Sequence, residues 1–438
     1  MITVSGSVPR QLTIKQSLLA AISTMLVWGL EYYDIILFAS LAPILEMYFF
    51  PSKLAIISAI ETWGAFASTY FVRPIGAMIF GWIGDVHGRR AATIIDAALV
   101  GLATLSIGLL PTYTTVGIAA PVLLYTMRML QGIGLGGEAG GGATWALELT
   151  PRNIRPYING VMYSGLSWAV FLTSFVTLSM KSLMRESFAI IGWRILFITG
   201  AIPALIALVI RLWGSESMEW IERVKTCGVV KVPLSIVLSQ YWIPLIALIL
   251  INLGLTIYYY GGSGYWPYVM RDIVAPKLGL PPDKAYTWAL VLGIYGGIGA
   301  VIGELLSGFL IRLVGIRSSF IIPSALMLLL SPLIVYLAFT MNPLSIYTSL
   351  LMGILFGLTA APQTLYFTSI FPTEIRWSAV AFGWNINASI GPLTTAALLF
   401  ALEYSSSSPF TIAIYGSVIM IIGALLVVLG SLIRAREY

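Results

Sequence analysis

Long apolar segments recur along the whole of this 438-residue chain. A helix needs about 20 mostly apolar residues to cross the hydrocarbon core of a bilayer. We predict twelve such spans, near residues 17–48, 56–82, 91–110, 117–147, 157–180, 192–213, 241–270, 287–313, 319–340, 344–370, 378–402 and 409–433. The segments are continuous rather than short and alternating, which excludes a membrane β-barrel. The sequence therefore predicts an all-α integral membrane protein.

Charged residues are scarce in this chain. They make up 10% of it, whereas apolar residues make up 58%. A soluble domain carries about 25% charged residues, so this composition excludes a soluble enzyme, a disordered chain and a disulfide scaffold. The single cysteine, Cys227, allows no intramolecular disulfide. Residues 1–16 do not resemble a cleaved signal peptide, so we expect the first span to remain as a helix.

The basic residues are distributed unevenly between the loops. With both termini inside the cell, the inner segments hold fifteen lysines and arginines, and the outer loops hold seven. The positive-inside rule then places both termini in the cytoplasm of a multi-pass cell-membrane protein. This topology accounts for the net charge of +6, so no nucleic-acid partner is needed.

The chain divides into two halves. Its longest stretch outside the spans predicts an N-terminal bundle at residues 1–213, a cytoplasmic interdomain linker at 214–240 and a C-terminal bundle at 241–438. The pattern P-x-x-I-R follows the fourth span at Pro151–Arg155 and the tenth at Pro372–Arg376. Repeated halves of this kind are typical of secondary transporters.

Ionisable residues inside spans are the first candidates for function, because each costs about 2.5–3.5 kcal/mol on insertion scales. Most of them lie in the first half: Glu31, Asp34, Glu61, Arg73, Asp96, Arg128 and Glu138, with Glu304 the main one in the second half. We therefore expect proton coupling in the first half and mainly substrate contacts in the second. For Glu61 and Glu304, cavity lining and structural pairing remain equal alternatives.

Three carboxylates are the candidate proton carriers. Glu31 and Asp34 share a helix face, and two such carboxylates repel when both are ionised, which favours proton binding near neutral pH. Asp34 is the first choice. Glu138 lies nearer the cytoplasmic end of its span and is a candidate release site.

The fourth span places Arg128, Gln131 and Glu138 on one face, among glycines that allow close approach of a neighbour. Arg128 and Glu138 are about 15 Å apart along the axis and cannot pair directly. Arg128 must therefore meet a partner on another helix or an anionic substrate, and Gln131 is a candidate substrate contact beside it. A structural ion pair is also expected between Arg73 and Asp96, because antiparallel helices around the 82–90 loop bring them to similar depth.

The loop between the second and third spans reads Gly81-Trp82-Ile83-Gly84-Asp85-Val86-His87-Gly88-Arg89-Arg90. It resembles the signature loop of the major facilitator superfamily. The resemblance implies that Asp85 faces a helix N-terminus in the other half. Asp85 would then close the cytoplasmic side together with Gly81, Gly88, Arg89 and Arg90. The matching loop of the second half has Arg312 in place of Asp85, which leaves a second closing contact in doubt.

Three further motifs resemble the metabolite:proton symporter family: Glu31-Tyr32-Tyr33-Asp34, Arg73-Pro74-Ile75-Gly76, and Arg128-Met129-Leu130-Gln131-Gly132 followed by Gly136-Gly137-Glu138. The resemblance implies the major facilitator fold, with twelve transmembrane helices in two pseudo-symmetric six-helix bundles. It also implies that the first and fourth spans adjoin, so Asp34 is the expected partner of Arg128. A permanent structural ion pair is the alternative reading of that contact.

The resemblance implies a proton-coupled symporter that works by rocking alternating access on organic acids, proline or betaine. The buried arginines favour a carboxylate substrate. A sugar or drug carrier of the same fold is the alternative. The expected partners are a small-molecule substrate, protons and the lipid bilayer, with the chain a monomer. An enzyme is not expected, because no nucleophile–base pair or metal cluster occurs at bilayer depth.

The second half offers weaker candidates for substrate contacts: Tyr258, Tyr259, Trp266 and Asn385, with Asn387 weaker still. The aromatic residues could equally pack in the core or lie at the membrane interface. His87 is the only histidine, and it lies in the loop, which excludes a histidine-clustered metal site. We expect neither a metal nor a cofactor.

Overall fold

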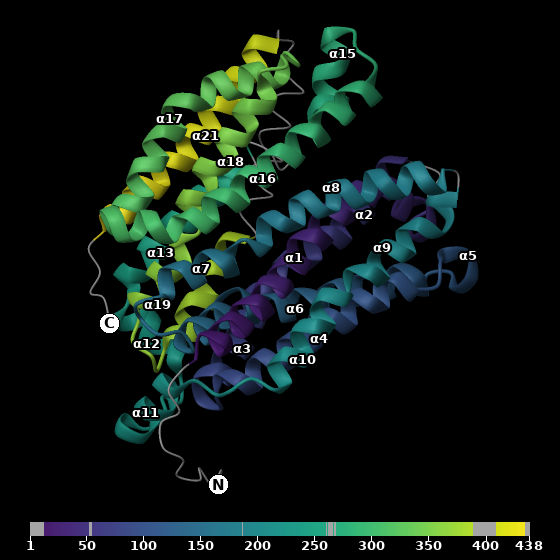
Figure 1. The fold of residues 1–438 in the computed structure, drawn as a ribbon. Coiled ribbons are helices and arrows are strands. Elements are labelled where there is room, and N and C mark those ends of the chain that lie inside the picture. The colour runs from purple at the N-terminus through teal and green to yellow at the C-terminus, as the bar shows by residue number, and fades with distance from the viewer. Residues whose placement is uncertain are drawn as a thin grey trace.

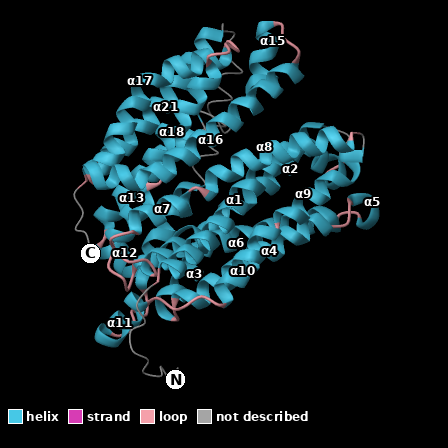
Figure 2. Cartoon of the chain, viewed as in Figure 1, coloured by secondary structure: helices cyan, strands magenta, loops and turns pink. Residues whose placement is uncertain are grey.

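The computed structural model describes residues 13–51, 55–185, 187–259, 261, 266, 269–388 and 409–433. Throughout this part of the chain, every regular element is a helix (Figure 2). The prediction of an all-α protein is therefore confirmed for the described residues.

The first bundle consists of helices from the first half of the chain that pack on one another. They are α1 (Ile14–Phe49), α2 (Ala55–Phe71), α3 (Arg73–Val86), α4 (Arg89–Leu109), α5 (Tyr113–Val116), α6 (Ala119–Glu148), α7 (Arg155–Tyr163), α8 (Gly165–Met184), η1 (Phe188–Gly192), α9 (Trp193–Gly200) and α10 (Ile202–Leu212). Helix α1 packs against α2, α6, α7, α8, α9 and α10, so its polar residues face the interior of this bundle.

The second bundle consists of helices from the second half of the chain. They are α13 (Trp242–Tyr259), η3 (Val269–Val274), α15 (Ala275–Leu278), α16 (Pro282–Val314), α17 (Ser318–Phe339), α18 (Ser345–Ala360), α19 (Pro362–Ser369), a helix at residues 376–388 and α21 (Pro409–Leu432). Helix α16 also packs against α7 and α8, and this contact joins the two bundles.

Two short helices connect the bundles: α11 (Met218–Cys227) and α12 (Pro233–Gln240). Both lie at one end of the molecule, which we call the linker end, whereas α5 and α15 lie at the opposite end (Figure 1). The bundles converge towards the linker end and diverge towards α5 and α15.

Several of the predicted spans are broken into two helices. The break falls just before a proline in three of them, at Pro74, Pro203 and Pro362, and each proline lies in the first turn of the downstream helix. A proline there lacks only a donor that the first turn does not use, but it cannot continue the helix before it. The breaks divide these spans between a linker-end segment and an opposite-end segment.

The outer surface is apolar. Leu183, Trp213 and Leu313 are each at least 80% exposed, which suits contact with lipid rather than water. Nine helical stretches within the described residues are long and apolar enough to cross a membrane. The other three predicted spans are 56–82, 117–147 and 378–402; the first is split into α2 and α3, and the last lies partly outside the described residues. The count of twelve stays a prediction.

Glycines bring α6 into backbone contact with its neighbours. A Cβ at Gly132 would lie less than 3.0 Å from Thr69 O of α2, and one at Gly136 less than 3.0 Å from Arg73 O of α3. The glycines of this span therefore allow neighbouring helices to approach closely, as expected from the sequence. This close packing holds Arg73 in position.

Candidate functional site

Arg73 lies where the two bundles meet. Its guanidinium forms an ion pair with Glu31 of α1, and its Nε donates to Asn385 Oδ1 at 2.7 Å. Asn385 belongs to the helix at residues 376–388 of the second bundle and also donates to Gly136 O at 2.8 Å. All three side chains are at most 5% exposed. One polar cluster therefore joins α1, α3 and α6 to the second bundle.

The expected pair between Arg73 and Asp96 is wrong. Asp96 contacts Arg211 of α10 at 3.0 Å, and Arg211 also pairs with Glu138 at 2.5 Å. Arg73 and Asp96 lie on adjoining antiparallel helices, but their side chains point to different neighbours. The depth of a residue in the membrane follows from its position in the sequence. The direction in which its side chain points around the helix axis depends on how the helices pack.

Arg211 was missed as a buried site residue, because its place at the end of a span suggested a cytoplasmic position. It is fully buried, and its Nε donates to Ser23 Oγ at 2.9 Å. Glu138 and Asp96 thus share one guanidinium inside the first bundle. An arginine in the last turn of an otherwise apolar helix was the available signal.

Arg128 forms the contact with Asp34 that the resemblance implied. Its guanidinium also donates to Gln131 Oε1 at 2.7 Å and lies 4.4 Å from the ring centroid of Phe38. Gln131 in turn donates to Thr104 Oγ1 of α4. Arg128 and Gln131 are fully buried within the first bundle. Neither residue lines either of the two cavities between the bundles that are described next.

A central cavity of about 40 Å³ lies between the bundles. Its polar and aromatic lining comes from both of them: Glu31, Tyr32, Tyr70, Arg73, Tyr163, Asn252, Thr256, Tyr259, Gln363 and Trp384. Gln363 donates to the Tyr163 hydroxyl, a bond that crosses between the bundles. No described residue bonds to Arg73 Nη2 or to Gln363 Oε1. Two residues that line this cavity thus each have one buried polar atom without a partner in the described part of the chain.

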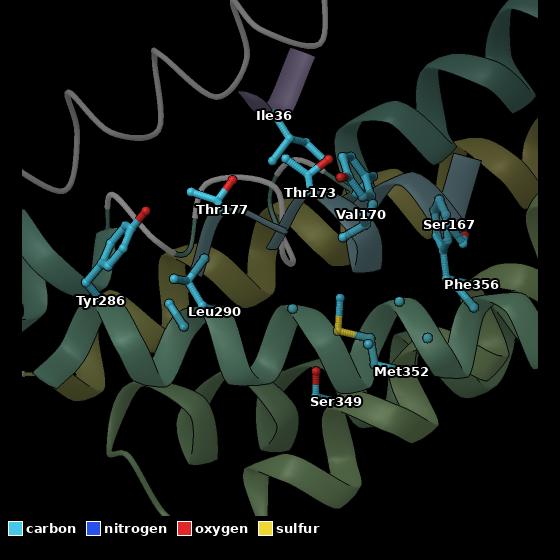
Figure 3. A pocket seen from close by; sticks show the side chains of 17 residues that line it. Ile36, Ser167, Val170, Thr173, Thr177, Tyr286, Leu290, Ser349, Met352 and Phe356 are labelled. Atoms are coloured by element: carbon cyan, nitrogen blue, oxygen red, sulfur yellow. The ribbon is translucent and has the colours of Figure 1, made fainter. Parts of the chain in front are cut away.

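A second cavity, of about 90 Å³, lies between α8 of the first bundle and α16 and α18 of the second. Figure 3 shows the hydroxyl groups of Ser167, Thr173, Thr177 and Ser349 around it, together with Tyr286. Its lining includes no charged side chain. Tyr259 and Phe356 line both cavities and separate the uncharged one from the charged one.

The candidate substrate residues of the second half have different positions. Tyr259 lines both cavities, and Asn385 holds Arg73 at the edge of the central one. Tyr258 is buried and stacks on Phe356, while Trp266 packs edge-on against Phe339 of α17. Tyr258 and Trp266 line neither cavity, so they are packing residues of the second bundle here.

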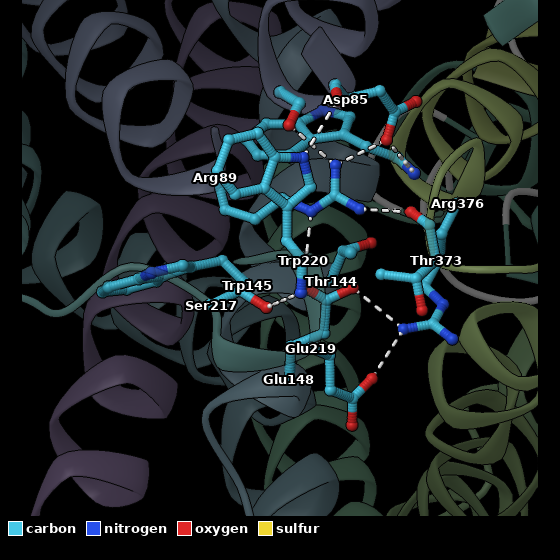
Figure 4. Close-up of polar contacts among 12 residues, drawn as sticks. Asp85, Arg89, Thr144, Trp145, Glu148, Ser217, Glu219, Trp220, Thr373 and Arg376 are labelled. Carbon is cyan, nitrogen blue, oxygen red and sulfur yellow. Dashed lines mark hydrogen bonds and ion pairs between the residues drawn. The ribbon is translucent and has the colours of Figure 1, made fainter. Parts of the chain in front are cut away.

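Asp85 caps a helix of the other bundle at the linker end. Its carboxylate accepts hydrogen bonds from Trp377 N at 3.3 Å and Ser378 N at 2.9 Å, in the first turn of the helix at residues 376–388. Arg89 pairs with Asp85 at 2.5 Å and donates to Thr373 O at 2.6 Å (Figure 4). This is the contact that the signature loop implied, and its role as a gate stays a prediction.

Gly81 and Gly88 of the predicted gate are glycines for two different physical reasons. A Cβ at Gly81 would lie 2.9 Å from the Cα of Ser378, so a side chain there would push the bundles apart. Gly88 has a φ of 112°, which side chains rarely adopt. That turn directs the backbone N–H groups of Arg89 and Arg90 to the carboxylate of Glu216, at 2.9 and 3.2 Å.

Ion pairs also tie the linker to the closed end. Arg376 bonds to Glu148 at 2.8 Å and to Glu219 of α11 at 3.0 Å, and Glu219 also pairs with Arg155. Burial raises the pKa of the Glu219 carboxyl, but Arg155 and Arg376 outweigh it and hold that pKa below its ordinary value. The motif around Glu216 and Glu219 thus fastens α11 to both bundles.

Comparisons with known proteins agree with this architecture. The structure superimposes on that of the proton:xylose symporter XylE from E. coli bound to 6-bromo-6-deoxy-D-glucose with a TM-score of 0.70. The superposition covers 96% of this chain and 94% of the other, at 19% identity. The chain therefore has the fold of this major facilitator protein.

Sequence relatives specify the family. Residues 19–226 match the family model for "Sugar (and other) transporter". The chain is 31% identical to the inner membrane metabolite transport protein YhjE of Escherichia coli, over 84% of each chain. It is 26% identical to the proline/betaine transporter of Salmonella typhimurium, over 90% of this chain and 79% of the other. The chain belongs to the major facilitator superfamily, in its metabolite:proton symporter family, and is a multi-pass cell-membrane transporter of a small molecule.

Proposed function

We propose that this protein is a proton-coupled symporter of a small carboxylate-bearing metabolite, working by rocker-switch alternating access. The observation that carries the proposal is Arg73, which lines the central cavity, pairs with Glu31 and has one buried nitrogen without a described partner. A guanidinium matches the two oxygens of a carboxylate. Proline and betaine, named for the Salmonella relative, both carry a carboxylate.

The ion pair between Glu31 and Arg73 offers a route to coupling. An ionised Glu31 occupies the guanidinium, whereas a protonated Glu31 releases it to a substrate carboxylate. Proton and anion then bind together, which symport requires. Asp34 and Glu138 remain alternative carriers; the Asp34–Arg128 pair lies outside both cavities, which favours a structural role for Arg128 and Gln131.

We also propose that the linker end faces the cytoplasm, with twelve spans, both termini inside and the bundles at residues 1–213 and 241–438. The excess of basic residues on the inner segments supports this orientation. The ion pairs at the linker end then close the cytoplasmic side, and the cavities open by separation of the opposite ends.

Liposomes that contain the purified protein test the coupling. Acidification outside should drive accumulation of a carboxylate substrate, and a protonophore should abolish it, because one charge moved across 100 mV is worth about 2.3 kcal/mol. Glu31→Gln mimics the protonated state, so it should keep counterflow of substrate yet lose accumulation driven by the pH gradient. Arg73→Ala should lose substrate binding itself.

Two comparisons make this test decisive. Glu222→Gln, at an exposed position on α11, is the matched control and should transport as the wild type does. Asp34→Asn separates the two candidate carriers. If Asp34→Asn loses proton-driven accumulation and Glu31→Gln keeps it, the coupling residue is Asp34. Uptake that follows a sodium gradient and ignores the proton gradient contradicts symport with protons.

A sugar or polyol carrier is the second candidate. The hydroxyl-lined, uncharged cavity of Figure 3 favours it, because such groups bond well to sugar hydroxyls. Counterflow with a panel of carboxylates, sugars and amino acids distinguishes the two, since only the true substrate exchanges.

A further inference from the structure

Glu304 is a buried carboxyl at the contact between the bundles. It lies on α16, which packs against α7 and α8 of the first bundle. Its side chain is fully buried. The backbones are also close there, because a Cβ at Gly160 of α7 would lie less than 3.0 Å from Glu304 O. No water-filled surface reaches this side chain while the bundles are packed together.

Glu304 has a single neutral hydrogen-bond donor. Ser167 Oγ of α8, across the interface, donates to Oε1 at 2.7 Å. Oε2 has no partner among the described residues, and none of their ion pairs includes Glu304. The other acids that are buried among the described residues each pair with an arginine: Glu31, Asp34, Asp85, Asp96, Glu138 and Glu148. Glu304 therefore differs from them in kind.

The surroundings of Glu304 supply no charge to balance it. Tyr163 of α7 is the titratable group that acts on it, and its hydroxyl already accepts a bond from Gln363. Arg155 of α7 pairs with Glu219, and Arg312 lies about 12 Å further along α16 and donates to Asn153 O. Two tyrosines on other helices of the second bundle, Tyr347 of α18 and Tyr336 of α17, face outwards. Tyr366 of α19 donates a hydrogen bond to Ile433 O. The basic residues Lys284 of α16 and Arg271 of η3 lie at the opposite end of the molecule.

An ionised carboxylate with one neutral donor is strongly disfavoured in such a place, and the group takes up a proton instead. We propose that Glu304 is a second proton-binding site of this transporter, protonated while the bundles are packed at the linker end and ionised when they separate. The protonated Oε2 is a donor and leaves no buried charge. When α16 moves away from α7 and α8, water reaches the carboxyl, and the proton passes to that water.

The buried cluster of Asp96, Glu138 and Arg211 does not have this property. It also holds more acids than bases, but its members come from α4, α6 and α10 of the first bundle alone. Movement of one bundle against the other leaves that cluster intact. Glu304 belongs to the second bundle, whereas its hydrogen-bond donor Ser167 belongs to the first. Its protonation state therefore changes when the two bundles separate.

A crosslink at the linker end provides the test. Arg312 of α16 reaches Asn153 O of the first bundle, so Asn153→Cys with Arg312→Cys in a Cys227→Ser background, joined by a short bis-maleimide crosslinker, should lock the closed state. In the crosslinked protein at neutral pH, the infrared spectrum should contain a carbonyl band of a protonated carboxyl that is lost in Glu304→Gln. Ser167→Ala should shift this band, because its hydrogen bond is removed. Equal bands with and without Glu304→Gln would overturn the proposal.

A second measurement does not depend on spectroscopy. The same crosslinking rate is measured with Glu304 and with Glu304→Gln. Dividing the rate of Glu304→Gln by the rate with Glu304 present cancels the pH dependence of the thiol reaction. This ratio should rise with pH, by up to about tenfold per pH unit once the opened state ionises, because only Glu304 loses a proton on opening. Glu222→Gln is the matched control and should give a flat ratio. A flat ratio for Glu304→Gln as well contradicts the proposal.

The inference rests on the proposed function only in assuming that the bundles separate during transport. Both measurements use purified protein without substrate. A failure to transport carboxylates with protons would therefore leave the titration of Glu304 standing, and an ionised Glu304 would leave the proposed symport standing.

Discussion

Single residues in the first bundle show where sequence reasoning succeeds and fails. Glu31, Asp34, Arg73, Arg128 and Glu138 were all identified as buried, because a charge inside an apolar run is visible in the sequence. Their partners were harder to predict, because the rotation of each helix about its axis decides which neighbour a side chain meets. Asp34 and Arg128 meet as the family resemblance implied, whereas Arg73 and Asp96 do not.

Arg211 is expected to be essential for stability. Arg211→Met removes the one cation between Asp96 and Glu138 and leaves both acids buried, which should cost about 3–5 kcal/mol. Adding Glu138→Gln should restore part of the loss. Arg223→Met is the control, because Arg223 pairs with Glu374 at the surface, where a pair is worth about 0–1 kcal/mol. Thermal unfolding in detergent measures all three, and equal losses for Arg211→Met and Arg223→Met contradict the assignment.

At the scale of helices, composition predicted where the spans lie but not how they are built. The long apolar runs located most of the described helices. The breaks before Pro74, Pro203 and Pro362 were not predicted, although proline is a known breaker. Proline inside a membrane span can also be accommodated, as in α17, which continues through Pro323 and Pro332. The packing of neighbouring helices determines whether a span breaks before a proline or continues through it. The positions of those helices are not visible in one sequence.

The contact of α6 with α3 gives a prediction for one glycine. Gly136→Ala places a methyl group against the backbone of Arg73, so it should force the two helices apart at a cost of about 1–3 kcal/mol. Gly297→Ala on α16 is the matched control, because its Cβ would lie at an ordinary 3.4 Å from its nearest neighbours. Melting temperatures compare the two variants. A Gly136→Ala protein as stable as Gly297→Ala would show that α3 and α6 have room between them.

At the scale of the whole molecule, ion pairs join the linker to both bundles at the end where it lies. The signature loop predicted that Asp85 would face a helix of the other half. It did not reveal how α11 contributes, because the sequence pattern around Glu216 and Glu219 carries no information about distant arginines such as Arg155 and Arg376. The central cavity was equally invisible, since its lining comes from both bundles.

The ion pairs of Glu219 predict a pH dependence of stability. Burial raises its pKa, but Arg155 and Arg376 lower it more, so the folded pKa lies below the ordinary value of a glutamate. Such a group contributes stability above its unfolded pKa and loses it as pH falls through the folded pKa. Glu219→Gln should therefore lower the melting temperature at pH 7, and the difference should shrink below about pH 4. The same difference at both pH values would exclude the ion pairs as its cause.

The bonds between the bundles at membrane depth have a consequence for the speed of movement. Gln363 to Tyr163, Thr364 to Asn159, Asn159 to Ala361 and Asn385 to Gly136 all join neutral groups. A neutral hydrogen bond contributes about 0.5–1.5 kcal/mol net, whereas separating a buried ion pair costs several times more. At this depth the strong ion pairs stay whole inside the first bundle, and the described bonds between the bundles include these neutral ones, that of Ser167 to Glu304 and that of Arg73 to Asn385. The buried ion pair of Arg376 with Glu148 joins the bundles at the linker end instead, so the activation barrier for moving one bundle against the other should lie mainly there.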